Sequence, residues 1–78
     1  MNNKVTFGAL DRVLADLAFH KAPLDGSHIA YEHAPSDTLL VVPRHRPGDP
    51  VDEKTLIVVR KMLVEKGLIE PGELDSRL

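Results

Sequence analysis

The spacing of apolar positions predicts a helix near each end of the chain. In the first half, Leu10, Val13 and Leu14 recur three and four residues apart, which is the spacing of the buried stripe of an amphipathic helix. Thr6 precedes them as a suitable N-cap, because its hydroxyl can accept a hydrogen bond from a main-chain N–H of the first turn. We therefore predict a first helix over residues 6–17.

The second helix is predicted between Asp52 and Gly67. Asp52 is a suitable N-cap, and glycine is the residue type that most readily adopts the left-handed conformation after a helix. The predicted buried stripe comprises Leu56, Val59 and Leu63, widened by Ile57, Val58, Met62 and Val64. The tail from Ile69 to Leu78 is expected to add one weak turn near Pro71.

Three short runs between the helices are predicted as β-strands, at residues 19–24, 28–34 and 38–42. Pro23 cannot donate a main-chain hydrogen bond, so the first run is assigned to an edge strand. The third run is apolar on both faces, and we expect it to be the central or best covered strand. Turn residues separate the runs, which favours antiparallel pairing of strands that are neighbours in sequence.

The register of the first hairpin depends on Asp25-Gly26. This dipeptide is typical of a two-residue type I′ turn, which requires positive φ at both positions. Such a loop pairs Pro23 with His28 and places Lys21 opposite Ala30, on the face that carries the histidine. A three-residue loop would shift the register by one residue and turn Lys21 to the core side. The two-residue loop is our prediction.

These elements form one α+β domain with the order α-β-β-β-α. Both helices need an apolar surface, and a three-stranded antiparallel sheet offers them one face. The other face is expected to stay open and to carry His28, while Tyr31 points to the core. The domain is expected to fill residues 1–78, with its core at about 6–69 and a short acidic tail at 70–78.

Composition restricts the class of protein. The 78 residues include no cysteine, which excludes disulfides and thiolate chemistry and fits a reducing compartment. No apolar run approaches the roughly 20 residues of a membrane span. The start, Met1–Lys4, leads into no signal-peptide core, so we expect a cytoplasmic protein. The net charge of −2 weighs against nucleic-acid binding, but residues 38–66 carry +2 while both ends are acidic.

Several short motifs occur in an order and at spacings that together indicate a family. They comprise Leu17-Ala18-Phe19, Gly26-Ser27-His28, Tyr31, His33, Val41-Val42-Pro43-Arg44-His45, Thr55-Leu56 and Gly67-Leu68. This ordered set, over roughly residues 7–69, resembles the HicA (YcfA-like) family of small toxins. The resemblance implies a fold like that of double-stranded-RNA-binding domains, with the same α-β-β-β-α order.

The resemblance also implies a function. HicA-like proteins are toxins of type II toxin–antitoxin systems; they cleave mRNA and are neutralised by a HicB antitoxin. The family's catalytic residue is the histidine of a Gly-Ser/Thr-His motif, which here is His28. We therefore expect a metal-independent endoribonuclease with His28 as general acid or base, without a cofactor, and with RNA and a HicB-like antitoxin as partners.

The residue types around His28 fit that chemistry. Cleavage of RNA without a metal needs a base for the 2′-hydroxyl proton and donors that hold the phosphate, and an imidazole titrates near working pH. Asp25 is a candidate for orienting the imidazole. The candidate RNA contacts are the turn residues Gly26 and Ser27 together with Lys21, Arg44, His45, Arg46 and Lys54.

Plainer interpretations stay open for these residues. A histidine after a turn is more often structural or simply exposed, Arg44 and Arg46 fit a solvated loop equally well, and His45 fits an exposed loop residue. His33 is expected at the core edge with a hydrogen bond, and Tyr31 is expected in the core rather than stacked on bases.

Two alternative functions remain. The first is a catalytically inactive domain of the same fold that binds RNA or a protein partner. The second is an interaction module whose open sheet or edge strand pairs with another chain. No metal site is predicted, because no pair of histidines has helical ligand spacing.

Overall fold

The computed structural model describes residues 5–78; Met1–Lys4, where the sequence offers no signal-peptide core, lie outside that range. The elements in chain order are α1 (Phe7–Asp16), β1 (His20–Pro23), β2 (His28–His33), η1 (Ala34–Ser36), β3 (Thr38–Pro43), α2 (Glu53–Glu65) and α3 (Glu73–Arg77). The predicted α-β-β-β-α order is therefore confirmed, with a 3₁₀ turn and a short third helix added to it.

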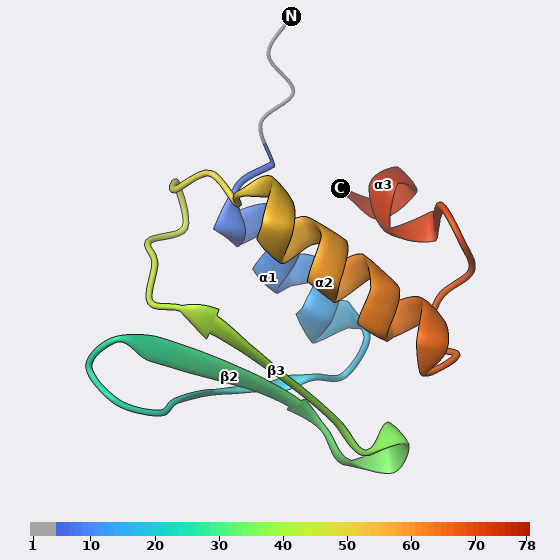
Figure 1. The fold of residues 1–78 in the computed structure, drawn as a ribbon, viewed down its shortest axis with the longest axis horizontal. Coiled ribbons are helices and arrows are strands. Elements are labelled where there is room, and N and C mark those ends of the chain that lie inside the picture. Colours follow the sequence, from blue (N-terminus) through green and yellow to red (C-terminus); the bar gives the residue numbers. More distant parts are fainter. Residues whose placement is uncertain (1–4) are drawn as a thin grey trace, which may run out of the picture.

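The helices pack on one face of the sheet (Figure 1). The three strands are antiparallel in the order β1-β2-β3, so β2 is the central strand. Helices α1 and α2 lie side by side between the sheet and α3, which returns along their outer side (Figure 1). Among residues 5–78, no helix covers the opposite face of the sheet, as predicted.

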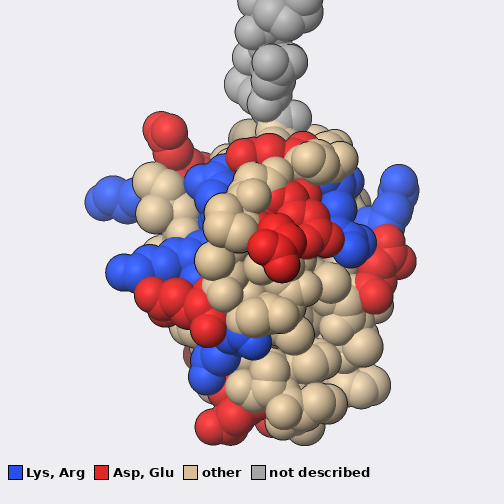
Figure 2. Space-filling model, turned by 90° about the vertical axis from the view of Figure 1, so that its right-hand side faces the viewer, with Lys and Arg blue, Asp and Glu red and all other residues tan. Residues whose placement is uncertain are grey.

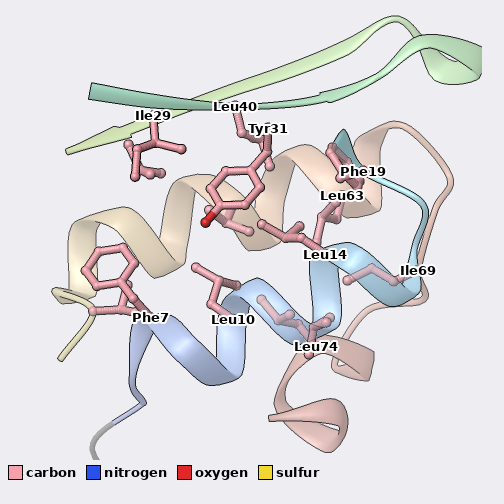
Figure 3. Packing of buried hydrophobic residues seen from close by; sticks show 14 residues of the cluster. Phe7, Leu10, Leu14, Phe19, Ile29, Tyr31, Leu40, Leu63, Ile69 and Leu74 are labelled. Carbon is pink, nitrogen blue, oxygen red and sulfur yellow. The ribbon is translucent and has the colours of Figure 1, made fainter. Parts of the chain in front are cut away.

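Buried apolar side chains fill the space between the sheet and the helices (Figure 3). The buried cluster comprises Phe7, Leu10, Val13, Leu14, Phe19, Ile29, Tyr31, Leu40, Val42, Val51, Val59, Leu63, Ile69 and Leu74. The predicted stripe of α1, the Val59 and Leu63 positions of the predicted α2 stripe and the predicted core position of Tyr31 are therefore confirmed. Burial of these side chains is the main stabilising contribution, at roughly 25 cal/mol per Å² of apolar surface.

The predicted caps are present at both long helices. The Thr6 hydroxyl accepts a hydrogen bond from the Ala9 N–H at 3.2 Å, and the Asp52 carboxylate accepts one from the Thr55 N–H at 3.3 Å. After α2, Gly67 adopts φ +73° and the next N–H, that of Leu68, donates to the Leu63 carbonyl. This pair of features is a Schellman ending, which glycine stabilises because it lacks a Cβ.

Helix α1 ends in the same way but with an alanine at the left-handed position. Ala18 has φ +70°, and the following N–H, that of Phe19, donates to the Leu14 carbonyl at 2.9 Å. Left-handed φ costs a residue with a Cβ roughly 1 kcal/mol, because the Cβ approaches the following carbonyl. The chain therefore holds local strain at the junction of α1 and β1.

The predicted register of the first hairpin is wrong by one residue. The Leu24 N–H donates to the His28 carbonyl, which closes a loop of residues 25–27, and Lys21 pairs with Tyr31. Gly26 has no positive φ, so the type I′ turn is absent. The Asp25 carboxylate holds this longer loop by accepting two main-chain N–H groups. Lys21 consequently lies on the core side of the sheet.

The prediction of β3 as the central or best covered strand is also wrong. It is an edge strand, and Leu39 and Val41 are 55% and 49% exposed on the uncovered face. Ile57 and Val58, predicted to widen the buried stripe of α2, are likewise more than half exposed. An apolar residue type therefore does not establish burial here.

The tail contributes more than the predicted weak turn. Helix α3 places Leu74 in the core with no exposed surface, which extends the buried cluster beyond the predicted limit near residue 69. Within residues 5–78, no helix is both long enough and apolar enough to cross a bilayer.

Candidate active site

The turn between β1 and β2 is held by one carboxylate. An oxygen of Asp25 accepts hydrogen bonds from the N–H groups of Ser27 at 2.6 Å and His28 at 2.8 Å. These two main-chain bonds lower the pKa of Asp25. The carboxylate therefore stays charged through the neutral range and fixes the backbone on which the His28 side chain is mounted.

The His28 imidazole lies beside that carboxylate and reaches solvent. Its Nδ1 is 3.5 Å from the same Asp25 oxygen, and the side chain is 49% exposed. Because β2 alternates, the ring lies on the uncovered face of the sheet, away from the helices. The arrangement gives His28 a charged neighbour at one nitrogen and open access at the other.

Arg44 braces the same turn from the end of β3. Its main-chain N–H donates to the Ser27 carbonyl at 2.7 Å, and its Nε donates to the Gly26 carbonyl at 3.1 Å. A Cβ at Gly26 would meet open space, so this glycine leaves the turn unobstructed rather than relieving a clash. A guanidinium and an accessible imidazole on the same turn are two groups of the kind that bind phosphate.

A second polar cluster lies on the helix side of the sheet. The Tyr31 hydroxyl donates to Asp11 at 2.7 Å, and the Lys21 ammonium lies 3.1 Å from the same carboxylate oxygen. Partial burial raises the pKa of Asp11, but the Tyr31 and Lys21 contacts outweigh it and the net shift is downward. Burial and the Asp11 carboxylate raise the pKa of Tyr31. The cluster therefore holds a neutral phenol against a charged pair.

His45 belongs to this cluster and is not the exposed loop residue that the plainer interpretation expects. Its ring stacks on Phe7 with centroids 3.8 Å apart, and its Nδ1 lies 2.8 Å from the Pro43 carbonyl. Its Nε2 is 3.5 Å from the Tyr31 hydroxyl. His45, Phe7, Asp11 and Lys21 line an open cleft of about 610 Å³ beside the start of α1.

The predicted site residues therefore divide into groups. Gly26, Ser27, His28 and Arg44 come together at the turn, whereas Lys21 and His45 line the cleft on the other side of the sheet. Lys54 lies at the opposite edge of the sheet, in a groove between β3 and α2. Arg46 is held in its loop, where its N–H donates to the Asp49 carboxylate.

Three further residues lie in these groups without having been predicted there. Asp11, Arg12 and Phe7 line the cleft with Lys21 and His45. Sequence pattern does not single these residues out, because the contact of Asp11 with Lys21 depends on how α1 packs against the sheet. His33 is where the sequence places it, at the core edge with its Nδ1 2.7 Å from the Ser36 hydroxyl.

Figure 2 views the end away from the hairpin, where acidic and basic side chains intermix. Among residues 5–78, no three histidine or carboxylate side chains gather in a group that could hold a metal ion.

Comparisons of the chain with protein-family models, with curated proteins and with solved structures found no match.

Proposed function

We propose that the chain is a metal-independent endoribonuclease of the HicA-like toxin type, with His28 as its general base. The observation that supports this proposal is the turn itself, where a half-exposed imidazole lies 3.5 Å from a charged carboxylate and where Arg44 binds the Gly26 carbonyl of the same turn. The Gly26-Ser27-His28 motif adds the family resemblance. The substrate that this resemblance supports is mRNA, in the cytoplasm.

The proposed reaction is an internal transfer of the phosphodiester. The Nε2 of His28 removes the proton of a ribose 2′-hydroxyl, and the 2′-oxygen attacks the adjacent phosphorus. The bond from phosphorus to the 5′-oxygen breaks, that oxygen takes a proton from solvent, and a 2′,3′-cyclic phosphate remains. A positioned base of this kind typically contributes about 10²–10⁴-fold to the rate.

Neighbouring groups have supporting roles in this proposal. Asp25 acts as a positioning residue, because a carboxylate at Nδ1 favours the tautomer whose Nε2 is free to accept a proton. Arg44 stabilises the charge that develops on the phosphate oxygens. The Ser27 and His28 N–H groups already bind Asp25, so main-chain contacts of these two residues to phosphate are not part of the mechanism.

Growth and mRNA integrity after induced expression in a bacterial host test this function. Wild type is expected to arrest growth and deplete mRNA, whereas His28→Ala is expected to do neither. His20→Ala is the matched control, since His20 is an exposed histidine at the other end of the same uncovered face. Equal toxicity of wild type and His28→Ala would reject the assignment.

The second candidate is a catalytically inactive domain that binds RNA or protein. The feature that favours it is the apolar, uncovered side of β3, which a nuclease does not need. Binding of RNA without cleavage, unchanged in His28→Ala, would support this candidate instead. A HicB-like antitoxin belongs to the first candidate, and co-expression of such a partner should restore growth.

A further inference from the structure

The two edges of the sheet differ in how they are protected. Strand β1 is short, and Lys21 and Pro23 occupy it; a charged residue and a proline are common devices against strand pairing. Strand β3 has six residues and no charge, and the apolar side chains of Leu39 and Val41 stay half exposed. Of these two edges, only β3 is long, apolar and free to receive another strand.

The hydrogen-bond alternation of β3 shows which of its main-chain groups face outward. The Arg44 N–H donates to the Ser27 carbonyl, and antiparallel pairs alternate between bonded and non-bonded. Val42, Leu40 and Thr38 therefore bond to β2. The N–H and C=O groups of Leu39 and Val41 point away from the sheet.

A groove runs along this edge. It has a volume of about 210 Å³, lies between β3 and α2, and is lined on the helix side by Lys54, Thr55, Val58, Val59 and Met62. Val58 is 57% exposed although it is apolar. An exposed strand edge next to an apolar groove is the usual geometry for strand addition.

We propose that the occupant of this edge is β3 of a second copy of the chain, paired antiparallel about Leu40. Because both outward residues lie one position from Leu40, a two-fold axis there sets Leu39 opposite Val41 of the partner subunit. The two-fold axis generates two such Leu39–Val41 pairs between the subunits, and each pair exchanges two main-chain hydrogen bonds. The strand is thus complementary to itself without any shift in register, and the sheet becomes six-stranded.

The charges on α2 agree with the same two-fold axis. Helix α2 runs antiparallel to β3, since Lys66 near its end donates to the Asp37 carbonyl just before the strand. Lys54, Val58 and Glu65 share one face by helical spacing, so this face is basic at one end, apolar in the middle and acidic at the other. The axis brings Lys54 against Glu65 of the partner subunit at both ends.

The size of the surface formed by the β3 edge and the exposed face of α2 indicates how tightly two copies of the chain should bind. Helix α2 has 13 residues and is therefore about 20 Å long. With the β3 edge, this is a surface at the small end of the range for specific interfaces, where weak and transient complexes are common. We therefore expect a dissociation constant in the micromolar range, roughly 1–100 µM.

Sedimentation equilibrium of the full chain tests the proposal. Over roughly 1–500 µM, wild type is expected to pass from monomer to dimer. Val41→Lys places a charge on the pairing edge and should raise the dissociation constant at least about ten-fold. Ala22→Lys is the matched control, because Ala22 lies in the same cross-strand row on the other edge, and this variant should still dimerise.

A charge exchange provides a second test that does not touch the sheet. Lys54→Glu and Glu65→Lys should each weaken the dimer, because each sets like charges against one another. The double variant should restore it. The amide hydrogens of Leu39 and Val41 should also exchange more slowly as concentration rises, while that of Lys21 should not change.

Two results would overturn the proposal. The first is a wild-type chain that stays monomeric over the whole range, which would leave the edge to a different protein. The second is a dimer that Val41→Lys and both single charge variants leave unchanged, which would place the interface elsewhere.

Discussion

Asp25 shows how one side chain can determine both a turn and a candidate site. It accepts two main-chain hydrogen bonds and also lies beside the His28 Nδ1. The same Asp-Gly dipeptide led us to predict a two-residue loop instead of the three-residue loop observed. The dipeptide alone does not reveal that the Asp25 carboxylate binds the N–H groups of Ser27 and His28. Residue type at this turn predicted a turn before β2 correctly, but not the register of the hairpin.

The left-handed backbone conformation of Ala18 should destabilise the fold, and a substitution tests this. Replacing it with glycine should raise the free energy of unfolding by about 1 kcal/mol, because glycine adopts φ +70° without a Cβ penalty. Chemical denaturation measures the change. Gly67→Ala, at the equivalent position after α2, should lower stability by a similar amount. An Ala18→Gly variant no more stable than wild type would contradict the strain at this position.

At the scale of elements, local rules predicted the helices better than the strands. Caps at Thr6 and Asp52 and the Gly67 ending depend on hydrogen bonds within a few residues, and all three are present. The position of β3 in the sheet depends on strand order, which its own composition does not contain. An apolar strand can be central or can be an edge that serves as an interface.

Helix α3 shows the same limit, because its place in the fold depends on one side chain. Leu74 is fully buried, and α3 is also tied to α2 by Arg60, whose guanidinium lies 2.9 Å from Asp75. With a single apolar residue as its signal, a five-residue helix is hard to distinguish from a disordered tail by sequence pattern.

Truncation of Leu74 tests whether the tail is part of the core. Leu74→Ala should cost about 2–5 kcal/mol of unfolding free energy, because it removes a buried side chain and leaves a cavity. Urea denaturation gives the value. Leu24→Ala, at an exposed leucine of the hairpin, should change stability by less than about 0.5 kcal/mol. Equal effects of the two variants would contradict the packing of α3.

At the scale of the whole molecule, the polar cluster at the cleft connects α1 to both β1 and β2. Asp11 of α1 binds Lys21 of β1 and Tyr31 of β2 through one carboxylate oxygen. This contact was not foreseen, because the two-residue loop would have sent Lys21 to the opposite face. Because the predicted hairpin register was wrong by one residue, the contact of Lys21 with Asp11 could not be predicted.

The cluster predicts an acid-sensitive fold. The pKa of Asp11 is lower in the folded chain than its usual value of 3.8, so the unfolded chain binds the proton more readily. The stabilising contribution is therefore present above pH 3.8 and is lost as pH falls toward the lowered value.

Thermal unfolding between about pH 2 and pH 7 measures this contribution. Asp11→Asn should lower the melting temperature at neutral pH and should match wild type more closely in acid. Asp16→Asn is a control on the exposed side of the same helix and should leave the profile unchanged. A constant difference between Asp11→Asn and wild type at all pH values would contradict the ionic role of Asp11.

If His28 removes a 2′-hydroxyl proton during RNA cleavage, the products and the rate should both depend on its imidazole. Purified wild type and His28→Ala are incubated with single-stranded RNA in the presence of a chelator, and the ends of the products are identified. Wild type is expected to give 2′,3′-cyclic phosphate ends, and His28→Ala is expected to cleave at least about 100-fold more slowly. Cleavage at equal rates by both proteins, or RNA left intact by folded wild type, would contradict this role of His28.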